Sequence, residues 1–318
     1  VSTRSPESII HSFINMDTVA ETISHGSTKS SIRLDNGLQC DLRAVSNAEY
    51  PFTLNYFTGS KAHNIQVRAL ALKKGYKLNE YGLIPKTDKK SYSTISESIH
   101  TESDLYQALG LKMIHPCLRE NSGELEAAEN NKLPELVTLE NLRGTFHNHT
   151  TASDGKNTLE EMASAAKDLG MQYLGISDHS KSSVQANGLS AEQLLSQTKE
   201  IQSLNDSSSN DFRIFSGIEC DILKDGTLDY EDEILSKLDY CIASIHSSFS
   251  LPEKEMTSRI IKAIENPNVT MIGHLTGRLL LIRKPYAVNV SKIIDACASN
   301  HTHIEINANP HRLDMDWR

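Results

Sequence analysis

The sequence of 318 residues predicts an α/β protein in which a parallel β/α barrel follows a smaller α+β region. Three observations lead to this prediction. From Gly144 onward, short apolar segments alternate with helical segments, which is typical of parallel sheets. Several of these apolar segments run into His, Asp or Glu, and candidate ligands at successive strand ends favour a barrel over an open sheet. Earlier in the chain, an Asn-Gly turn between two short apolar segments indicates an antiparallel hairpin.

Composition places the chain among ordinary globular proteins. Hydrophobic residues make up 38% and charged residues 23%, and the length predicts two or three domains. No segment approaches the roughly 20 apolar residues that a membrane-spanning helix needs. The start of the chain lacks a basic and then apolar leader, so we expect neither membrane insertion nor secretion. Five cysteines without CxxC spacing favour reduced thiols in the cytoplasm.

The charge is distributed unevenly. A net charge of −9 would argue against a nucleic-acid partner if it were spread evenly, because phosphate binding relies on Lys and Arg. Residues 1–90, however, contain 12 Lys or Arg and 8 Asp or Glu, whereas residues 91–318 contain 20 and 33. We therefore expect the two parts to have different functions.

The first elements are helical and are followed by a hairpin. Pro6 stands at a first helical position, and apolar residues from Ile9 to Ile23 suggest one or two short helices. Residues 31–34 and 38–45 then form the two strands around the turn. In the second strand Asp41 faces away from the apolar side chains, so it could hold a metal ion on the sheet surface. An exposed strand aspartate is more often simply solvated.

The next stretch carries a family resemblance. Residues 56–60 read YFTGS, and a helix is expected from about Lys61 to Lys74. The run YFTGSKAHNIQVRALALKKGYKLNEYGL resembles the thumb of the family X DNA polymerases, and the hairpin with Asp41 is similar to the end of their palm. The run TESDLYQALGLKMIHPCLRE, at residues 101–120, looks like the segment that closes the polymerase core in bacterial members.

This resemblance implies specific roles. Asp41 would be the third metal-binding carboxylate of a catalytic palm that uses Mg²⁺ in the full-length enzyme. The implied contacts to dNTP and DNA come from Tyr56, Phe57, Gly59, Ser60, Asn64 and Arg68, with the first three at the nucleotide sugar, Asn64 at its base and Arg68 near the template. The alternatives are core packing for the two aromatic residues and a solvated helix face for Arg68.

The chain also departs from the family X pattern. No Asp-x-Asp pair and no Gly-Ser loop for a triphosphate precede Asp41, and one carboxylate cannot hold two Mg²⁺ ions. We expect residues 1–55 to be the end of a palm whose catalytic start is missing, followed by a thumb over residues 56–120. Primer extension by this chain would contradict that expectation. Residues 121–143 are polar and acidic, and they are expected to connect the thumb to a domain over residues 144–318.

That domain opens with a dense group of candidate ligands. Alternate residues of a strand point to one side, so His147 and His149 could reach one ion. Asp154 follows in a polar loop. A Thr-x-x-Glu capping box at Thr158 then begins a helix that ends at Gly170. The next strand, residues 173–177, leads into Asp178 and His179.

The same order repeats along the rest of the chain. Strands over residues 212–218, 239–245 and 269–273 lead into Glu219, His246 and His274, and residues 303–307 supply a sixth strand. Helices are expected over residues 191–204, 258–265 and 291–300. One His after one strand is more often a structural residue than a ligand, but candidates after successive strands favour a metal site.

The remaining polar candidates receive structural interpretations. Asp221 and Asp225 are expected to be loop carboxylates, and Asn307 could line the pocket. The histidines outside the repeated pattern are expected to be structural. They are His11, His25, His63, His100, His115, His301, His303 and His311.

The second part of the chain is similar to the PHP (polymerase and histidinol phosphatase) family. The stretches TFHNHTTASDG, ISDHS, GIECD, ASIHSS and GHLTG match its motifs, and EINANPHRLD resembles the bacterial polymerase X version. The resemblance implies a distorted barrel that holds two or three divalent ions and hydrolyses phosphoesters. The implied ligands are His147, His149, Asp154, His179, Glu219, His246 and His274. The family's last motif, Asp-x-His, has no counterpart before Arg318, so we expect two ligands to be missing and one barrel edge to be open.

Ligand type and family resemblance together predict the function. Imidazole and carboxylate groups without thiolates suit Zn²⁺, Mn²⁺ or Fe²⁺, and Glu219 is suited to bridge two ions and take part in catalysis. We expect a bacterial family X DNA polymerase used in repair, whose PHP domain hydrolyses phosphoesters at DNA ends as a 3′-5′ exonuclease or phosphatase. The alternatives are a separate phosphatase of the histidinol phosphatase type and a non-catalytic DNA-binding fragment.

Overall fold

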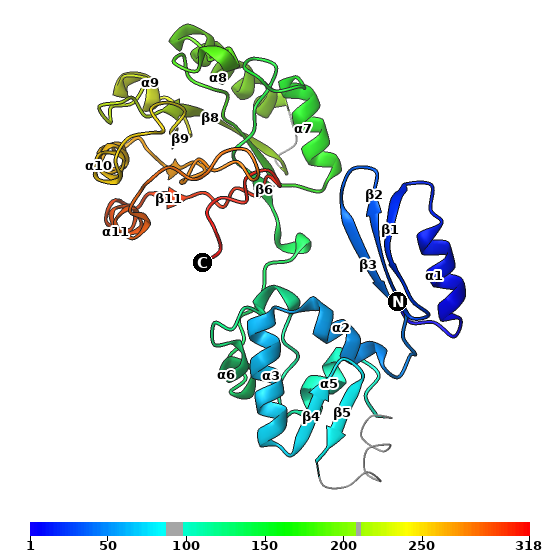
Figure 1. The fold of residues 1–318 in the computed structure, drawn as a ribbon. Coiled ribbons are helices and arrows are strands. Elements are labelled where there is room, and N and C mark those ends of the chain that lie inside the picture. The colour runs from blue at the N-terminus through cyan, green and yellow to red at the C-terminus, as the bar shows by residue number, and fades with distance from the viewer. Residues whose placement is uncertain (87–97, 208–210) are drawn as a thin grey trace. The chain divides into compact units, whose positions relative to one another are not determined.

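The computed structural model describes residues 1–86, 98–207 and 211–318 and contains two compact units, Val1–Leu136 and Val137–Arg318 (Figure 1). In the first unit, helix α1 (Pro6–Ile14) precedes an antiparallel sheet in the order β1-β2-β3. The expected hairpin is confirmed, because β2 (Lys29–Leu34) and β3 (Gln39–Arg43) pair antiparallel. Gly37, in the turn between these strands, has a φ of +86°, which glycine adopts without a steric penalty.

The prediction of helical structure as far as Ile23 is wrong for the second part of that segment. Residues Val19–His25 form strand β1, and Thr22 pairs with Ile32 of β2. Val19, Thr22 and Ile23 are β-branched, which favours a strand. The neighbouring hairpin also offers an edge whose backbone groups can be paired, so strand pairing outweighs the weak helical pattern.

The rest of the first unit combines helices with a small hairpin. Helix α2 covers Tyr50–Thr58, and α3 covers Lys61–Lys73, as expected. Strands β4 (Tyr76–Asn79) and β5 (Gly82–Pro85) pair antiparallel, and α5 covers Glu102–Ala108. A 3₁₀ turn, η1, follows at Pro116–Leu118. The shared core includes Phe52, Val67, Leu83, Leu105, Tyr106 and Leu109.

Residues 121–143, expected to be a connection, contain regular structure. Helix α6 covers Glu124–Glu129 and buries Glu124 and Ala128 against the first unit. The division between the two units follows Leu136, and a 3₁₀ turn, η2, covers Leu139–Asn141. The acidic composition of residues 121–143 is typical of an exposed linker. Glu124 is nevertheless buried, because its carboxylate contacts a buried side chain of α3.

That partner is His63, the centre of a buried polar chain. His63 Nδ1 lies 2.6 Å from Glu124 Oε1, and His63 Nε2 lies 2.8 Å from the Tyr106 hydroxyl. Asn55 Nδ2 donates to the same hydroxyl at 3.0 Å. Burial lowers the pKa of His63, although Glu124 opposes that shift, and burial raises the pKa of Tyr106 to about 12. The neutral imidazole of His63 on α3 thus contacts both α6, through Glu124, and α5, through Tyr106.

This lowered pKa predicts an acid-sensitive first unit. Because folded His63 resists protonation, its contribution to stability is present above the unfolded value of 6.5 and is lost as the pH falls below it. The free energy of unfolding should then fall by at most about 1.4 kcal/mol for each pH unit. Urea unfolding of residues 1–136, followed by hydrogen exchange of α3 at pH 7.5, 6.5 and 5.5, should show this loss. His63→Gln should flatten the slope, whereas His25→Gln, at an exposed histidine, should leave it unchanged.

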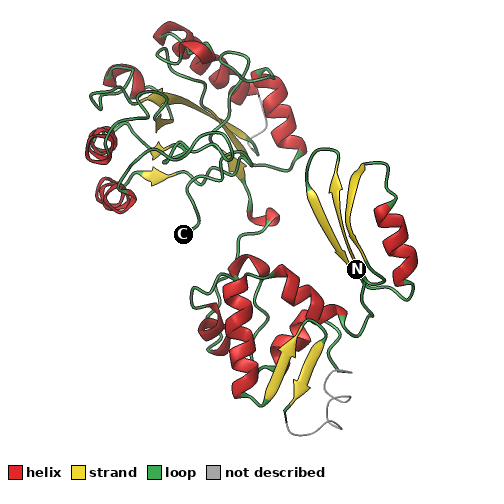
Figure 2. Cartoon of the chain, in the orientation of Figure 1, coloured by secondary structure: helices red, strands yellow, loops and turns green. Residues whose placement is uncertain are grey.

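The second unit is built on one curled parallel sheet of six strands (Figure 2). The strands lie side by side in chain order, and every neighbouring pair is parallel. Their bounds are β6 Gly144–Thr145, β7 Tyr173–Ile176, β8 Arg213–Asp221, β9 Tyr240–Ser244, β10 Met271–Ile272 and β11 His303–Ile304. Because parallel strands run in one direction, all their carboxyl ends meet at one edge of the sheet. The predicted α/β architecture is confirmed, with the sheet closed over part of a barrel.

Helices follow the strands around the outer side of the sheet (Figure 1). They are α7 Leu159–Asp168, α8 Ala191–Ser207, α9 Asp232–Leu235, α10 Glu253–Ile264 and α11 Val290–Asn300, with the 3₁₀ turn η3 at Val184–Ala186. The predicted capping box is confirmed, because Thr158 accepts from Glu161 N and Glu161 accepts from Thr158 N. Helix α10 begins earlier than expected, after Pro252, with acidic residues in its first turn that suit the helix dipole.

Two apolar clusters join these helices to the sheet. Ile260 and Ile293 of α10 and α11 pack with Ala243 and Ile272 of the strands, and Leu159 and Ile201 of α7 and α8 belong to a second cluster with Ile176 and Ile214. Burial of each such side chain contributes about 1.5–3 kcal/mol. This core fixes the strand ends that carry the polar residues. Among the described helices, none has the length and apolar character needed to cross a membrane.

Candidate metal centre

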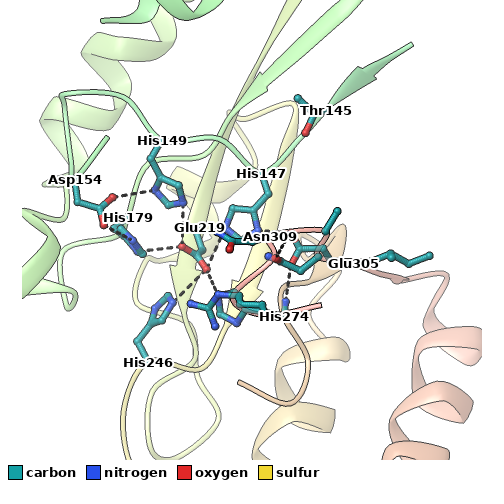
Figure 3. Close-up of a pocket in the computed structure, with 14 residues that line it drawn as sticks. Thr145, His147, His149, Asp154, His179, Glu219, His246, His274, Glu305 and Asn309 are labelled. Carbon is teal, nitrogen blue, oxygen red and sulfur yellow. Dashed lines mark hydrogen bonds and ion pairs between the residues drawn. The ribbon is translucent and has the colours of Figure 1, made fainter. Parts of the chain in front are cut away.

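Polar side chains from all six strand ends line one cavity of the second unit. The cavity has a volume of about 470 Å³, and Figure 3 shows Glu219 between the other labelled side chains. Its lining residues are Thr145, His147, His149, Asp154, His179, Glu219, His246, His274, Glu305, Ile306, Asn307, Ala308, Asn309 and Arg312. The structure therefore brings together all seven ligands implied by the PHP resemblance and confirms that Asn307 lines the pocket.

Five imidazoles converge on the carboxylate of Glu219, which is only 1% exposed. The nearest is His274, whose Nε2 lies 2.8 Å from Glu219 Oε1. Four further nitrogen-to-oxygen distances are 3.2 Å from His147 Nε2, 3.5 Å from His149 Nε2, 3.0 Å from His179 Nδ1 and 3.2 Å from His246 Nε2. Glu219 is not a loop residue after its strand, because β8 continues through it to Asp221.

These side chains form three groups of potential ligands, each with its atoms within 4.8 Å of one another. The first contains His147, Glu219 and His274. The second contains His179, Glu219 and His246, and the third contains His149, Asp154 and His179. Glu219 and His179 each belong to two groups, so neighbouring groups share a side chain. This is the arrangement expected where several cations lie close together.

The expectation that His147 and His149 occupy alternate positions of a strand is wrong. Strand β6 ends at Thr145, so the two-residue alternation does not extend to either histidine. Their ring centroids are 5.3 Å apart, and they belong to different groups. His149 lies instead beside His179, with ring centroids 4.4 Å apart.

Glu305 is a member of the site that sequence reasoning missed. Its Oε1 lies 2.6 Å from His147 Nδ1, and its Oε2 accepts from the backbone N–H of His274 at 2.5 Å. The same rule that identified the other candidates, a polar residue directly after an apolar strand, could have found it. The predicted strand continued through Asn307, but β11 ends at Ile304, so Glu305 stands at the strand end.

Asp221 is not the loop carboxylate that was expected. It is the last residue of β8, it is buried, and its Oδ1 meets Nδ1 of His246. Ser183 donates its hydroxyl to Asp221 Oδ2 at 2.8 Å. Asp221 and Glu305 thus act alike, because each holds Nδ1 of one histidine while the Nε2 of that histidine faces Glu219. Asp225 does lie in a turn and accepts from Thr227.

Asp178 orients the loop that carries His149 and Asp154. Its carboxylate is completely buried and accepts from Thr150 N, Thr150 Oγ1, Ser153 Oγ and Gln197 Nε2 at 2.5–2.7 Å. These donors belong to the loop after β6 and to helix α8. One charged group therefore joins three segments that are distant in the sequence.

The pKa shifts show how strongly the charges in the cavity interact. Burial disfavours protonation of His147, but Glu219 and Glu305 outweigh it and raise the pKa to about 10. Burial and the neighbouring histidines lower the pKa of His149 to about 4 although Glu219 opposes them, whereas Asp221 and Glu219 overcome burial and raise that of His246 to about 9. Burial would raise the pKa of Glu219, but the histidines hold it well below its usual range.

The unpaired atoms of the cavity fit a bound cation. In the part of the chain that the structure describes, the buried Nδ1 atoms of His149, His179 and His274 make no well-aligned hydrogen bond, although carboxylate oxygens of Asp154 and Glu219 lie near the first two. Buried polar atoms normally have one. Imidazole nitrogens and carboxylate oxygens without thiolates are the donor set of Zn²⁺, Mn²⁺ and Fe²⁺. The residues present therefore suit divalent ions.

The structure separates the candidate polymerase residues into exposed and structural groups. Tyr56 and Phe57 are 38% and 58% exposed, so the alternative of core packing is wrong for both, and Arg68 is also exposed. Asn64 is buried and donates from Nδ2 to the Tyr56 carbonyl at 2.7 Å. The two residues between the helices have local roles, because Gly59 ends α2 with a positive φ and Ser60 caps α3 by accepting from His63 N.

Asp41 remains apart from any cluster of potential ligands. Its carboxylate is exposed on β3, and hydrogen bonding by Ser31 holds its pKa below its usual range. It lines a separate cavity of about 300 Å³ with Lys29, Arg43 and Phe57. The described residues form no potential metal group that includes Asp41.

Comparisons with known proteins match both units. A model of the PHP domain matches residues 145–309, and a model of the DNA polymerase beta thumb matches residues 53–120. The chain is 39% identical, over 99% of its length, to a Bacillus subtilis protein described as DNA polymerase/3′-5′ exonuclease PolX, and it spans 54% of that relative.

More distant matches cover single parts of the chain. A probable phosphatase of Caldicellulosiruptor saccharolyticus is 30% identical over 51% of this chain and 64% of the relative. A crystal structure of Leishmania infantum polymerase beta covers 36% of this chain and 47% of that chain, with 21% identity and a TM-score of 0.28. The curated relatives therefore include probable phosphatases that match about half of this chain.

Proposed function

Because the chain belongs to the PHP domain family and carries a polymerase beta thumb segment before that domain, we propose that it is part of a DNA polymerase of family X used in repair. Its second unit would hydrolyse phosphoesters at DNA ends as a metal-dependent 3′-5′ exonuclease. The observation that carries this proposal is the convergence of five imidazoles on buried Glu219 at the strand ends.

The three groups of side chains are the proposed metal sites. His147, Glu219 and His274 would hold one ion, and His179, Glu219 and His246 would hold a second. His149 and Asp154 would complete a third site with His179. Zn²⁺ or Mn²⁺ suits this donor set. Bound ions would supply Lewis acidity, which activates water and stabilises the charge on the phosphoryl oxygens.

The chain's own residues prepare this site. Glu305 and Asp221 fix the rings of His147 and His246, so that Nε2 of each ring faces the shared carboxylate. Glu219 is shielded from water, so its charge acts at full strength on the groups around it. Glu219 is therefore the residue we propose to be catalytic in this unit, as the carboxylate common to two sites.

The first unit would bind DNA and dNTP in the full-length enzyme. The exposed Tyr56 and Phe57, with Arg68 on the next helix, present aromatic and cationic groups that suit a nucleotide and a template strand. Gly59, Ser60 and Asn64 would hold these groups in place. Asp41 would contribute to an Mg²⁺ site together with carboxylates from the rest of a palm. The five free cysteines suit a cytoplasmic location.

The alternative of a phosphatase for small phosphoesters rests on the probable phosphatases that match about half of this chain. A comparison of the hydrolysis rates on different substrates separates the two functions. The chain reconstituted with Mn²⁺ or Zn²⁺ should shorten a single-stranded DNA from its 3′ end and should act on a 3′-phosphorylated primer faster than on histidinol phosphate. Chelation should abolish the activity, and elemental analysis should find at least two ions per chain. A preference for histidinol phosphate would support the phosphatase, and fewer than two ions with no nuclease activity would support a non-catalytic fragment.

A further inference from the structure

A small hairpin of the second unit carries three apolar residues at its tip. Leu279 and Arg283 pair antiparallel, and the hairpin tip between them consists of Leu280, Leu281 and Ile282. Leu281 is fully exposed, and Ile282 is 78% exposed. We propose that this hairpin tip binds the bases of a DNA end and separates the terminal base pair next to the cavity. The inference rests on the proposed function and names the surface that prepares the DNA end for it.

Hydrogen bonds hold the base of the hairpin. The backbone N–H of Leu279 donates to the Arg283 carbonyl at 2.9 Å, and the N–H of Arg283 donates to the Leu279 carbonyl at 2.8 Å. The Arg283 side chain donates from Nε to the Gly277 carbonyl at 2.9 Å, and its guanidinium lies 4.1 Å from the centroid of the Phe249 ring. The hairpin tip is therefore preorganised, so it loses little conformational freedom when it contacts a ligand.

Leu281 contributes little to the stability of the fold. Its φ is +64°, in the left-handed region that glycine adopts freely and that leucine adopts only at a cost in free energy. Because the side chain is fully exposed, burial of apolar surface does not offset this cost. Contact with a ligand explains an apolar residue that is both strained and exposed.

Further hydrogen bonds attach the hairpin to the wall of the cavity. The backbone N–H of Leu280 donates to the His311 carbonyl at 2.7 Å. Arg278, just before the hairpin, donates from Nε to the Arg312 carbonyl at 2.8 Å. His311 lies between Asn309 and Arg312, which both line the cavity. The hairpin tip is thus joined directly to the wall that a DNA end in the cavity would contact.

The charge around the hairpin favours DNA as the partner. Residues 266–294 contain four Lys or Arg and no Asp or Glu, although residues 91–318 contain 20 Lys or Arg and 33 Asp or Glu. Lys284 directly follows the hairpin and is exposed. Cationic side chains bind DNA phosphates, and Leu and Ile are among the apolar side chains that proteins insert between base steps. An apolar tip within a cationic segment therefore matches both parts of a DNA strand.

The size of the cavity explains why the terminal base pair must open. A volume of about 470 Å³ is typical of a pocket for one small ligand, so it suits a single nucleotide and not a base-paired end. Enzymes that act on one nucleotide of a duplex must overcome its stacking and pairing. Contact of Leu281 and Ile282 with the exposed base faces would stabilise the opened end.

Fluorescence of 2-aminopurine at the 3′ terminus of a blunt DNA duplex tests the inference, because this base becomes brighter when it leaves the stack. The last linkage is a phosphorothioate, which resists hydrolysis, and Mn²⁺ is present. Leu281→Asn removes the apolar side chain but keeps a residue type that tolerates a positive φ. Leu169→Asn makes the same change at an exposed leucine at the end of α7. For the same rise in fluorescence, Leu281→Asn should require a roughly 10-fold higher concentration than the unaltered chain or the Leu169→Asn control.

The salt dependence of duplex binding tests the cationic part of the surface. Lys284→Gln should reduce the slope of log Kd against log salt concentration by about one. Lys254→Gln removes an equal charge from the exposed face of α10 and should leave the slope unchanged.

Hydrolysis of ordinary DNA separates this inference from the proposed function. Leu281→Asn should lower the ratio of blunt-duplex to single-strand hydrolysis roughly 10-fold. If the unaltered chain hydrolyses neither DNA, the proposed function fails, and the fluorescence still decides the role of the hairpin tip.

Two fluorescence results would overturn the inference. One is the absence of any rise with the unaltered chain. The other is a response of Leu281→Asn within about twofold of the Leu169→Asn control, which is the result expected if the hairpin tip binds a protein instead of DNA. If circular dichroism shows that Leu281→Asn does not fold, Ile282→Asn decides by the same criterion.

Discussion

Glu219→Gln should prevent the second unit from holding the proposed ions and lower the proposed phosphoesterase activity by roughly 1,000-fold or more. The substitution keeps the size of the side chain but removes the one negative charge that five imidazoles approach. Glu219 belongs to two of the three groups of potential ligands. Its loss should therefore affect two ions together, whereas the loss of a histidine that belongs to one group only, such as His246 or His274, should affect one.

The measurements are elemental analysis and hydrolysis of a 3′-labelled DNA strand. Glu255→Gln is the matched control, because it makes the same chemical change on the exposed face of α10. Circular dichroism should show that both variants are folded. A Glu219→Gln chain that retains its full metal content would contradict the assignment of this carboxylate as a shared ligand.

Asp178→Ala should lower the free energy of unfolding of the second unit by about 3–5 kcal/mol. The substitution leaves four donors, from Thr150, Ser153 and Gln197, without their common acceptor in a region closed to water. The loop that carries His149 and Asp154 would keep only the longer 3.5 Å contact between Gln197 Nε2 and Thr150 Oγ1 as a side-chain hydrogen bond to helix α8. We therefore also expect weaker metal binding at the group formed by His149, Asp154 and His179.

Urea unfolding followed by the fluorescence of Trp317, the single tryptophan of the chain, measures this effect. Asp168→Ala provides the control, because Asp168 is an exposed carboxylate at the end of α7. A destabilisation of less than about 1 kcal/mol for Asp178→Ala would show that water or other groups satisfy the four donors in its place.

The strand ends could be predicted from the sequence because the sheet keeps the order of the chain. Each apolar segment before Glu219, His246 and His274 is short and bounded, and parallel pairing then places the following residues at one edge. No knowledge of long-range contacts is needed for that step. The thumb helix after Ser60 was predictable for a similar reason, since its cap and its periodicity lie within a few residues.

The side chains that orient the ligands could not be predicted in this way. Asp178 receives donors from Ser153 and Gln197, which lie 25 and 19 residues away, and a buried acceptor has no local signal in a sequence. Asp221 looked like a loop residue because the length of β8 is set by its pairing with β9 rather than by its own composition. Strand β1 was missed for the same reason, because its partner decides its conformation.

The order of the strands in the sheet also has a consequence for biosynthesis. Because β6 to β11 lie side by side in the order of translation, the sheet can grow by one strand at a time as the chain leaves the ribosome. The group of His149, Asp154 and His179 would be complete first, and the group that needs His274 would be complete last. The cavity would therefore acquire these side chains in a fixed sequence during synthesis, and the segment with Glu305 and Arg312 would follow His274.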